Sequence, residues 1–161
     1  MSERPAGKDP NQPLHQALAS FRHQLRRFLL VSESEANSAG LHPQQHQLLL
    51  TVAGVPDDCS PSIAYAAEAL GLKHNSVVEL VDRCEREGLL NRVTDLEDRR
   101  RVCLRATARG QEVLNRLSQV HMRELNSQGP RLIEALEMVL QDRSHPRPRS
   151  SRKTSEQESH D

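Results

Sequence analysis

Apolar residues in the first third of the chain recur at helical spacing. The first stripe predicts one long amphipathic helix that runs from about Leu14 until Gly40 stops it. Its apolar positions are Leu14, Leu18, Phe21, Leu25, Phe28 and Leu29. A second helix is expected to begin at Pro43, because proline suits the first turn of a helix, and to end before Gly54.

Two shorter helices joined by a tight turn are predicted next. Ser60 stands before a proline in the manner of an N-cap, which predicts a helix over 61–70. Gly71 marks the turn, and another helix follows over about 74–87. Gly88 is expected to end that helix in the C′ position, where glycine adopts the left-handed conformation without strain.

After these helices the apolar pattern changes from a helical period to alternation. The segments 89–94 and 101–106 are short, and the polar sequence DLEDRR joins them. In the second segment one face carries Val102, Leu104 and Ala106, and the other carries Arg101, Cys103 and Arg105. The alternation predicts a two-stranded hairpin with a charged tip and places Cys103 on its outer face.

Two more helices are expected to close the domain, one from about Thr107 and one after a break at Gly129-Pro130. Their apolar positions are Val113, Leu117, Val120 and Leu125, then Leu132, Ile133, Leu136, Val139 and Leu140. The segments 14–40 and 111–142 therefore carry more apolar surface than one small domain covers. We expect them to be dimerisation helices that pack against their copies about a twofold axis.

Composition excludes several classes of protein. The chain has 161 residues, enough for one domain with a core, and only 2% are aromatic, which excludes a stacking platform for single-stranded nucleic acid. No apolar run approaches the ~20 residues of a membrane span, and three widely spaced cysteines fit no disulfide framework, so a reduced cytoplasmic protein is expected. No phosphate loop, nucleophile elbow or paired-carboxylate cleft is visible, so we expect neither an enzyme nor a cofactor.

Both ends of the chain have the composition of solvated segments. Residues 1–13 contain three of the nine prolines and no apolar period, which predicts a flexible N-terminal arm. Residues 143–161 are basic at first and acidic from Glu156, which predicts a disordered C-terminal tail. A solvated tail is the favoured interpretation, and contact of its basic part with a polyanion is the alternative.

The order of these elements predicts a mainly α protein with a small two- to three-stranded β wing. Residues 14–142 are expected to form a winged helix-turn-helix over 41–110, flanked by the dimerisation helices. The net charge is +0, but the stretch 92–109 contains six arginines against three acids. That local excess suits a DNA-binding surface, although a run of charge is also typical of a solvated face.

Several correlated motifs resemble the MarR (multiple antibiotic resistance regulator) family of bacterial transcription factors. The resemblance is carried by LGLKHNSVVELVDRCEREGLLNR and TDLEDRRRVCLRATARG, with Asp98-Arg99-Arg100 at the hairpin tip and Thr107 to Gly110 opening the next helix. It is closest over 41–110 and looser over 14–142. Ala106 and Ala108 depart from the family pattern, where leucine and proline are usual.

This resemblance implies roles for individual residues toward double-stranded DNA. Arg100 would enter the minor groove, with Asp98 orienting its guanidinium and Arg99 beside it. The alternative for this pair is a surface ion pair of the hairpin. At the start of the recognition helix we expect phosphate and base contacts from Lys73, His74, Asn75 and Ser76, and Arg83 is expected to contact phosphate.

Some positions on the recognition helix remain open between two roles. His74, Asn75 or Ser76 could instead be its N-cap. Glu79 either faces a cytosine amine or is solvated, and solvation is favoured. The helix is expected to expose Ser76, Glu79, Arg83 and Arg86 and to bury Val77, Val81 and Cys84.

The family also implies a small, often phenolic, anionic effector bound between the dimer helices and the reading heads. Arg22, Arg26 and His46 are the candidate ligand-binding residues, although the arginines also suit a solvated face. His42 and His46 are interpreted as structural, with His42 at a helix cap, so no metal site is predicted. Cys84 is expected in the core, and only Cys59 precedes a helix N-terminus that could lower its pKa.

The sequence therefore predicts a dimeric, sequence-specific DNA-binding transcriptional regulator, a repressor released by a small ligand. It would act on a pseudo-palindromic operator. Two alternatives stay open: a MarR-type regulator that responds to thiol oxidation, and a helical protein-interaction module without DNA binding.

Overall fold

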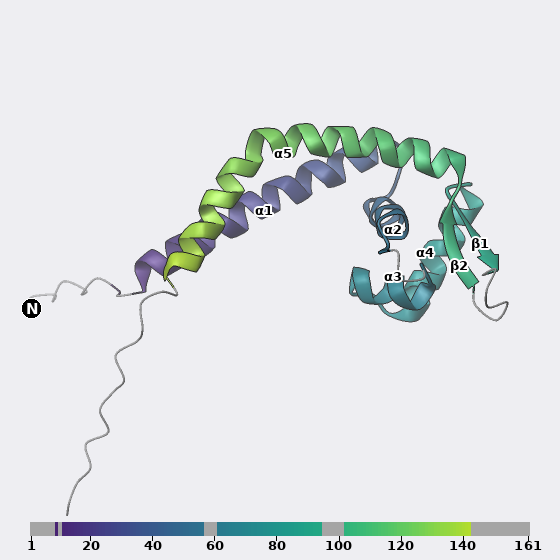
Figure 1. The fold of residues 1–161 in the computed structure, drawn as a ribbon, viewed down its shortest axis with the longest axis horizontal. Helices are drawn as coiled ribbons and strands as arrows, with labels where there is room; N and C mark the ends of the chain where they lie inside the picture. The colour runs from purple at the N-terminus through teal and green to yellow at the C-terminus, as the bar shows by residue number, and fades with distance from the viewer. Residues whose placement is uncertain (1–8, 10, 57–60, 95–101, 143–161) are drawn as a thin grey trace, which may run out of the picture.

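Two long helices form a stalk that carries a compact head at one end (Figure 1). The computed structural model describes residues 9, 11–56, 61–94 and 102–142. The stalk consists of α1 (Gln12–Ser38) and α5 (Ala108–Asp142), which pack along each other. The head consists of α2 (Pro43–Ala53), α3 (Ile63–Leu70), α4 (His74–Arg86), β1 (Leu90–Thr94) and β2 (Val102–Ala106). The predicted mainly α winged helix-turn-helix is confirmed.

The helix α2 begins where the sequence predicts, through a capping box. The ring of His42 accepts a hydrogen bond from the backbone N–H of Gln44 at 3.3 Å. The side-chain oxygen of Gln45 accepts one from the backbone N–H of His42 at 2.8 Å. Because these contacts satisfy N–H groups that the helix itself leaves unpaired, they fix the chain direction from α1 into the head. The structural role predicted for His42 is confirmed.

The start of α3 and the cap of α4 differ from the predictions. The N-cap of α3 is Ser62, two residues after the predicted Ser60, and its hydroxyl accepts from the N–H of Tyr65 at 3.1 Å. Lys73 is the N-cap of α4, and α4 has no side-chain capping bond within the described part of the chain. The suggestion that His74, Asn75 or Ser76 caps α4 is therefore wrong, because all three already lie in its first turn.

A single helix, α5, replaces the two helices predicted at the end of the domain. Pro130 lies inside it, and Gly129 before it does not adopt a positive φ. A proline inside a helix removes one backbone hydrogen bond and bends the helix, and α5 is bent in Figure 1. The predicted break is wrong because the apolar stripe continues past Pro130 and packs on α1, which outweighs the local cost of the proline.

The hairpin forms with the predicted strands. The described residues give two antiparallel strands, with Leu90 opposite Ala106 and Thr94 opposite Val102. Cys103, predicted on the outer face, is 8% exposed, whereas Val102 is 46% exposed. Consecutive residues of a strand point to opposite faces, and Leu104 is buried as well, so both faces of β2 are covered at this point. The outer-face prediction for Cys103 is therefore wrong.

One aliphatic core holds the head together and fixes the recognition helix. It takes side chains from every element of the head and from the start of α5: Leu41, Leu48, Leu49, Val52, Ala66, Val77, Leu80, Val81, Cys84, Leu89, Leu90, Leu104 and Leu114. Within α4, Val77, Val81 and Cys84 are fully buried, as predicted. Because this buried face cannot turn outward without losing its apolar contacts, the opposite face of α4 is held toward solvent.

The stalk leaves many large apolar side chains uncovered. Those with more than a third of their surface exposed are Leu18, Leu25, Leu29, Leu30, Met122, Leu125, Ile133, Leu136, Met138 and Leu140. None of the helices in the described ranges is long and apolar enough to cross a membrane.

Candidate nucleic-acid interface

The solvent face of α4 is polar and has exposed donors at its N-terminus. Lys73, His74, Asn75 and Ser76 are all exposed there, as the predicted contacts with DNA require. Further along the same face Glu79 and Arg86 are exposed and Arg83 is half-buried. An exposed helix that begins with hydroxyl, amide and imidazole groups can offer hydrogen bonds to base edges and phosphates.

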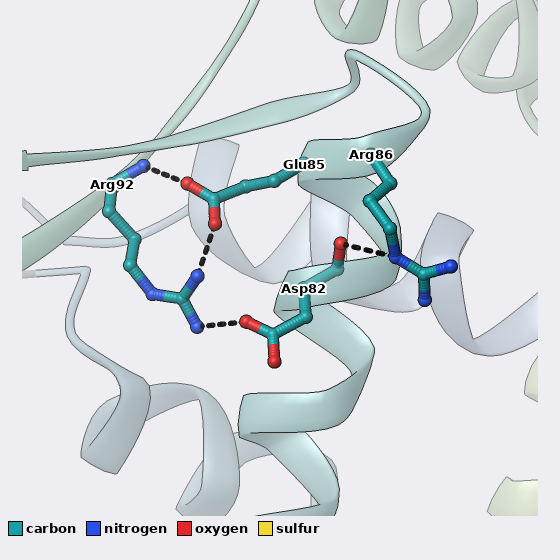
Figure 2. A network of polar contacts seen from close by, with 4 residues as sticks. All are labelled: Asp82, Glu85, Arg86 and Arg92. Atoms are coloured by element: carbon teal, nitrogen blue, oxygen red, sulfur yellow. Dashed lines mark hydrogen bonds and ion pairs between the residues drawn. The ribbon is translucent and has the colours of Figure 1, made fainter.

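Beside this face, Arg92 of β1 joins the hairpin to α4 (Figure 2). Its Nη2 contacts Oδ1 of Asp82 at 2.7 Å, and its Nη1 pairs with Oε2 of Glu85. Its backbone N–H donates to Oε1 of Glu85 at 2.8 Å. Burial alone would lower the pKa of Arg92, but the hydrogen bond to Asp82 and the charges of both carboxylates raise it, so the guanidinium stays charged.

Sequence reasoning counted Arg92 only as one of the positive charges of the wing. The structure pairs it with two carboxylates of α4, so it does not add to the free positive charge of the hairpin. Asp82 and Glu85 are three residues apart and thus lie on one side of the helix. The three-residue spacing of these two carboxylates is visible in the sequence, but it does not indicate that their partner is an arginine on a strand.

The predicted residues of the wing tip belong to the segment between β1 and β2. Asp98, Arg99 and Arg100 lie outside the described residues. The strands that carry the tip are described as far as Thr94 and Val102.

The Thr107–Gly110 motif joins the end of the recognition helix to the stalk. The hydroxyl of Thr107 donates to the carbonyl of Gly88 at 2.6 Å and accepts from the N–H of Gly110 at 3.0 Å. A Cβ on Gly110 would lie 2.1 Å from the carbonyl oxygen of Leu89, so only glycine fits. The motif therefore couples the position of α5 directly to the turn after α4.

The three predicted ligand-binding residues do not form one site. Arg22 and Arg26 lie on an open face of α1, together with Phe21, Leu25 and Leu29. His46 lies elsewhere, buried where α2 meets the stalk. The prediction grouped these three residues by their charge alone, because the sequence does not show which way each helix face points in the fold.

His46 belongs instead to a cluster of rings between the head and the stalk. Its ring centroid lies 4.9 Å from that of His121 on α5, and His121 lies 6.0 Å from Phe28 on α1. Burial lowers the pKa of both histidines; the charge of His121 lowers that of His46 further, whereas Glu35 partly opposes the effect on His121. The Nε2 atoms of both rings have no hydrogen-bond partner within the described part of the chain.

A second cavity, of about 400 Å³, lies at the junction of the stalk and the head. Its lining combines the end of α1 with the turn after α4 and the first turns of α5: Ala39, Gly40, Leu41, Glu87, Leu89, Arg109, Glu112, Val113 and Arg116. Sequence reasoning did not identify it, because the lining comes from three distant segments. Its charged lining is mixed: Arg109 and Arg116 are cationic groups of the kind that bind an anion, and Glu87 and Glu112 are anionic.

The environment of the cysteine on the recognition helix suppresses thiol reactivity. Cys84 is fully buried in the core, and burial, aided by the charge of Glu87, raises the pKa of its thiol to about 11. The thiolate is the reactive form of cysteine, so this environment suppresses oxidation. Cys59, the residue predicted to have a lowered pKa, lies outside the described residues.

Comparison with known proteins agrees with this geometry. The sequence model of the MarR family matches residues 39–101, which span the head from the end of α1 into the hairpin tip. A Thauera aromatica protein named as a putative transcriptional regulatory protein for the hcr operon is 28% identical over 138 residues, covering 82% of this chain and 81% of that protein.

Solved structures share the fold at lower identity. A mutant of MepR from Staphylococcus aureus, bound to an oligodeoxyribonucleotide, superposes with a TM-score of 0.57 at 19% identity, covering 77% of this chain and 95% of the other. CouR from Rhodococcus jostii RHA1, bound to p-coumaroyl-CoA, gives a TM-score of 0.55 at 22% identity, covering 75% and 86%.

These observations define a winged helix-turn-helix protein with a two-helix stalk. More narrowly, residues 39–101 match the sequence model of the MarR family, and the chain resembles a protein named as a transcriptional regulatory protein and shares the fold of MarR-family regulators. The resemblance inferred from the sequence is confirmed.

Proposed function

We propose that the chain is a dimeric transcriptional regulator that binds a pseudo-palindromic operator in double-stranded DNA. The observation that carries the proposal is the division of α4 into a fully buried apolar face and an exposed face that begins with Lys73, His74, Asn75 and Ser76. A helix held in this way from the inside presents a fixed set of donors to a major groove. Arg83 follows further along α4, where it can contact phosphate.

The wing supplies the second half of the proposed interface. The hairpin projects from the head beside α4 and carries Asp98, Arg99 and Arg100 at its tip in the sequence. In this proposal Arg100 enters the minor groove next to the recognition helix, with Asp98 holding its guanidinium. The MepR mutant with the same fold is bound to an oligodeoxyribonucleotide, which supports DNA binding by a protein of this shape.

Dimerisation is proposed from the uncovered apolar surface of the stalk. A monomer would expose the large side chains along α1 and α5, such as Leu30, Met122 and Ile133, each more than half exposed. A second copy of the chain is the partner with a matching surface, because a twofold axis packs the apolar surface of one stalk against the same surface of the other. The dimer would also present two copies of α4, one to each half-site of the operator.

The proposed regulation is repression that a small anionic ligand relieves. In the cavity at the junction of stalk and head, Arg109 and Arg116 of α5 would hold the anion, and Glu87 and Leu89 bring the turn after α4 to the same cavity. An anion bound there would meet the carboxylates of Glu87 and Glu112 as well, so its binding would favour a different position of α5 relative to the end of α4. CouR, with the same fold, is bound to p-coumaroyl-CoA, which supports a small-molecule effector. The oxidation-sensing alternative is disfavoured at Cys84, whose thiol is buried with a raised pKa.

Selection from a pool of random duplex DNA tests this function most broadly. The expected result is recovery of a pseudo-palindromic sequence whose half-sites are about one helical turn apart. Its affinity should fall steeply with salt, by a slope near −0.9 per phosphate contacted. A chain that retains no duplex at low ionic strength would instead be the helical protein-interaction module.

A further inference from the structure

The recognition helix and the wing are joined by a polar bridge as well as by the chain between them. We propose that Arg92 is a positioning residue: through Asp82 and Glu85 it sets the wing relative to α4, so that both elements meet one duplex in register. This inference rests on the proposed DNA-binding function and adds to it a residue that determines sequence specificity without contacting DNA.

The geometry of the bridge suits a rigid link. Arg92 uses its backbone N–H and one guanidinium nitrogen on Glu85, and the other terminal nitrogen on Asp82 at 2.7 Å (Figure 2). The fork of a guanidinium fixes direction as well as distance, which a lysine ammonium cannot do. The side chains of Arg92 and Glu85 are 29% and 31% exposed, so water screens their contact less than it screens a surface pair, whereas Asp82 is 51% exposed.

The bridge is placed where the hairpin leaves the core. Arg92 pairs across the sheet with Leu104, which is buried and whose N–H donates to the carbonyl of Pro61 at 2.7 Å. Two residues beyond, the paired strands reach Thr94 and Val102, which are both exposed. The bridge therefore acts at the base of the projecting part of the hairpin, where a small change of angle moves the tip the most.

The same contacts hold the bridge against the surface proposed to read DNA. Asp82 immediately precedes Arg83, and its backbone carbonyl accepts from Nε of Arg86 at 3.3 Å (Figure 2). Both arginines lie on the DNA-facing side of α4 in the proposed complex. The charge of the Arg92 guanidinium is balanced by the two carboxylates that it contacts, so it adds little attraction for a phosphate.

If Arg92 positions the wing, its loss affects DNA binding differently than if Arg92 only contributes positive charge. Loss of a phosphate contact or of positive charge weakens binding to all sequences by a similar factor. If the wing loses its fixed position relative to α4, binding weakens mainly to the duplex whose bases and groove shape are recognised. The reason is that the wing and α4 must then be ordered relative to each other on binding. The ratio of affinities for a selected operator duplex and for a scrambled duplex of the same length therefore separates the two.

The test measures this ratio by fluorescence anisotropy for the full chain and its variants. Arg92→Ala is expected to lower the ratio about tenfold, and Arg92→Lys, which keeps the charge, is expected to lower it by an intermediate factor. The triple variant Arg92→Ala, Asp82→Asn, Glu85→Gln also removes the two carboxylates that Arg92→Ala leaves without their partner, and its affinity ratio is not expected to recover. Arg105→Lys on the neighbouring strand is the matched control and should leave the ratio unchanged.

A measurement on the free protein tests whether Arg92 holds the hairpin in place, independently of DNA binding. Hydrogen exchange of the free Arg92→Ala variant should be faster in β1 and β2, with α2 and α3 as protected as in the parent chain. Equal weakening on both duplexes, recovery in the triple variant or unchanged exchange would overturn the inference. If the parent chain binds neither duplex, the proposed function itself fails; if it binds and the variants match it, only the inference fails.

Discussion

Gly110 of α5 packs directly on the carbonyl of Leu89, so close that an added Cβ would lie 2.1 Å from the carbonyl oxygen. Gly110→Ala must therefore move the backbone of α5 away from the end of α4. We expect it to lower the free energy of unfolding by about 2 kcal/mol, in the range of other overpacking substitutions.

Urea unfolding at fixed protein concentration measures that loss. Gln111→Ala, at the next and exposed position of the same turn, is the control and should change stability by no more than about 0.5 kcal/mol. A Gly110→Ala variant as stable as this control would mean that the two segments do not approach each other as described.

The paired rings of His46 and His121 predict a stability that falls in mild acid. Burial lowers the pKa of both histidines below 6.5, so the unfolded chain binds their protons more readily than the folded chain. Their contribution is therefore fully present above pH 6.5 and is lost as the pH falls from 6.5 toward the lowered pKa values. The slope reaches at most about 1.4 kcal/mol per pH unit for each proton.

Urea titrations between pH 5.5 and 8 follow this loss. His46→Gln should flatten the pH dependence, whereas His23→Gln, at an exposed position of α1, should leave it intact. Stability that stays level or increases as the pH falls through this window would contradict the burial of the pair.

Cys84 should resist modification in the folded chain. With a thiol pKa of about 11, roughly one thiol in a thousand is ionised at pH 8, and the side chain is fully buried. Alkylation with iodoacetamide, followed by peptide mass spectrometry, should leave Cys84 unmodified until urea unfolds the protein. Modification at the same rate with and without urea would show instead that the core opens readily around α4.

Charge placed on the stalk should separate the proposed dimer. Ile133 is 58% exposed in the single chain, and Ile133→Asp would bury a carboxylate if a partner covers it. Sedimentation equilibrium should then give 18.2 kDa for this variant and twice that mass for the parent. Leu50→Asp, at a position of α2 that is 49% exposed, serves as control and should remain dimeric; a parent chain of 18.2 kDa would refute the dimer.

The wing arginine proposed from the family resemblance has its own test. Arg100→Ala should weaken operator binding about tenfold, equivalent to about 1.4 kcal/mol, and leave the mass of the dimer unchanged. Gel-shift titration measures the effect, and Arg131→Ala, exposed on the distal half of α5, controls for the loss of one positive charge. Affinity equal to that of the control would reject a DNA contact by Arg100.

Features fixed by neighbouring residues were the ones that the sequence predicted well. The start of α2 at Pro43, the buried and exposed faces of α4 and the paired segments of the hairpin all follow from local spacing. The Thr107–Gly110 motif was recognised as well, and the structure shows its physical reason in the contact with Leu89.

Features that depend on distant packing were missed. Pro130 reads locally as a helix break, but packing on α1 keeps α5 continuous. Arg92 reads as a free positive charge, but the fold places it against Asp82 and Glu85. The separation of Arg22 and Arg26 from His46 likewise depends on how α1 and α2 are oriented, which their spacing alone does not reveal.

Hydroxyl-radical footprinting on a selected duplex tests most directly whether the face of α4 and the wing read DNA as a twofold pair. The predicted result is two related protected segments, centred about one helical turn or roughly 34–36 Å apart, each flanked by protection of the adjoining minor groove. A uniform cleavage pattern, or one protected segment without a symmetric mate, would contradict the account.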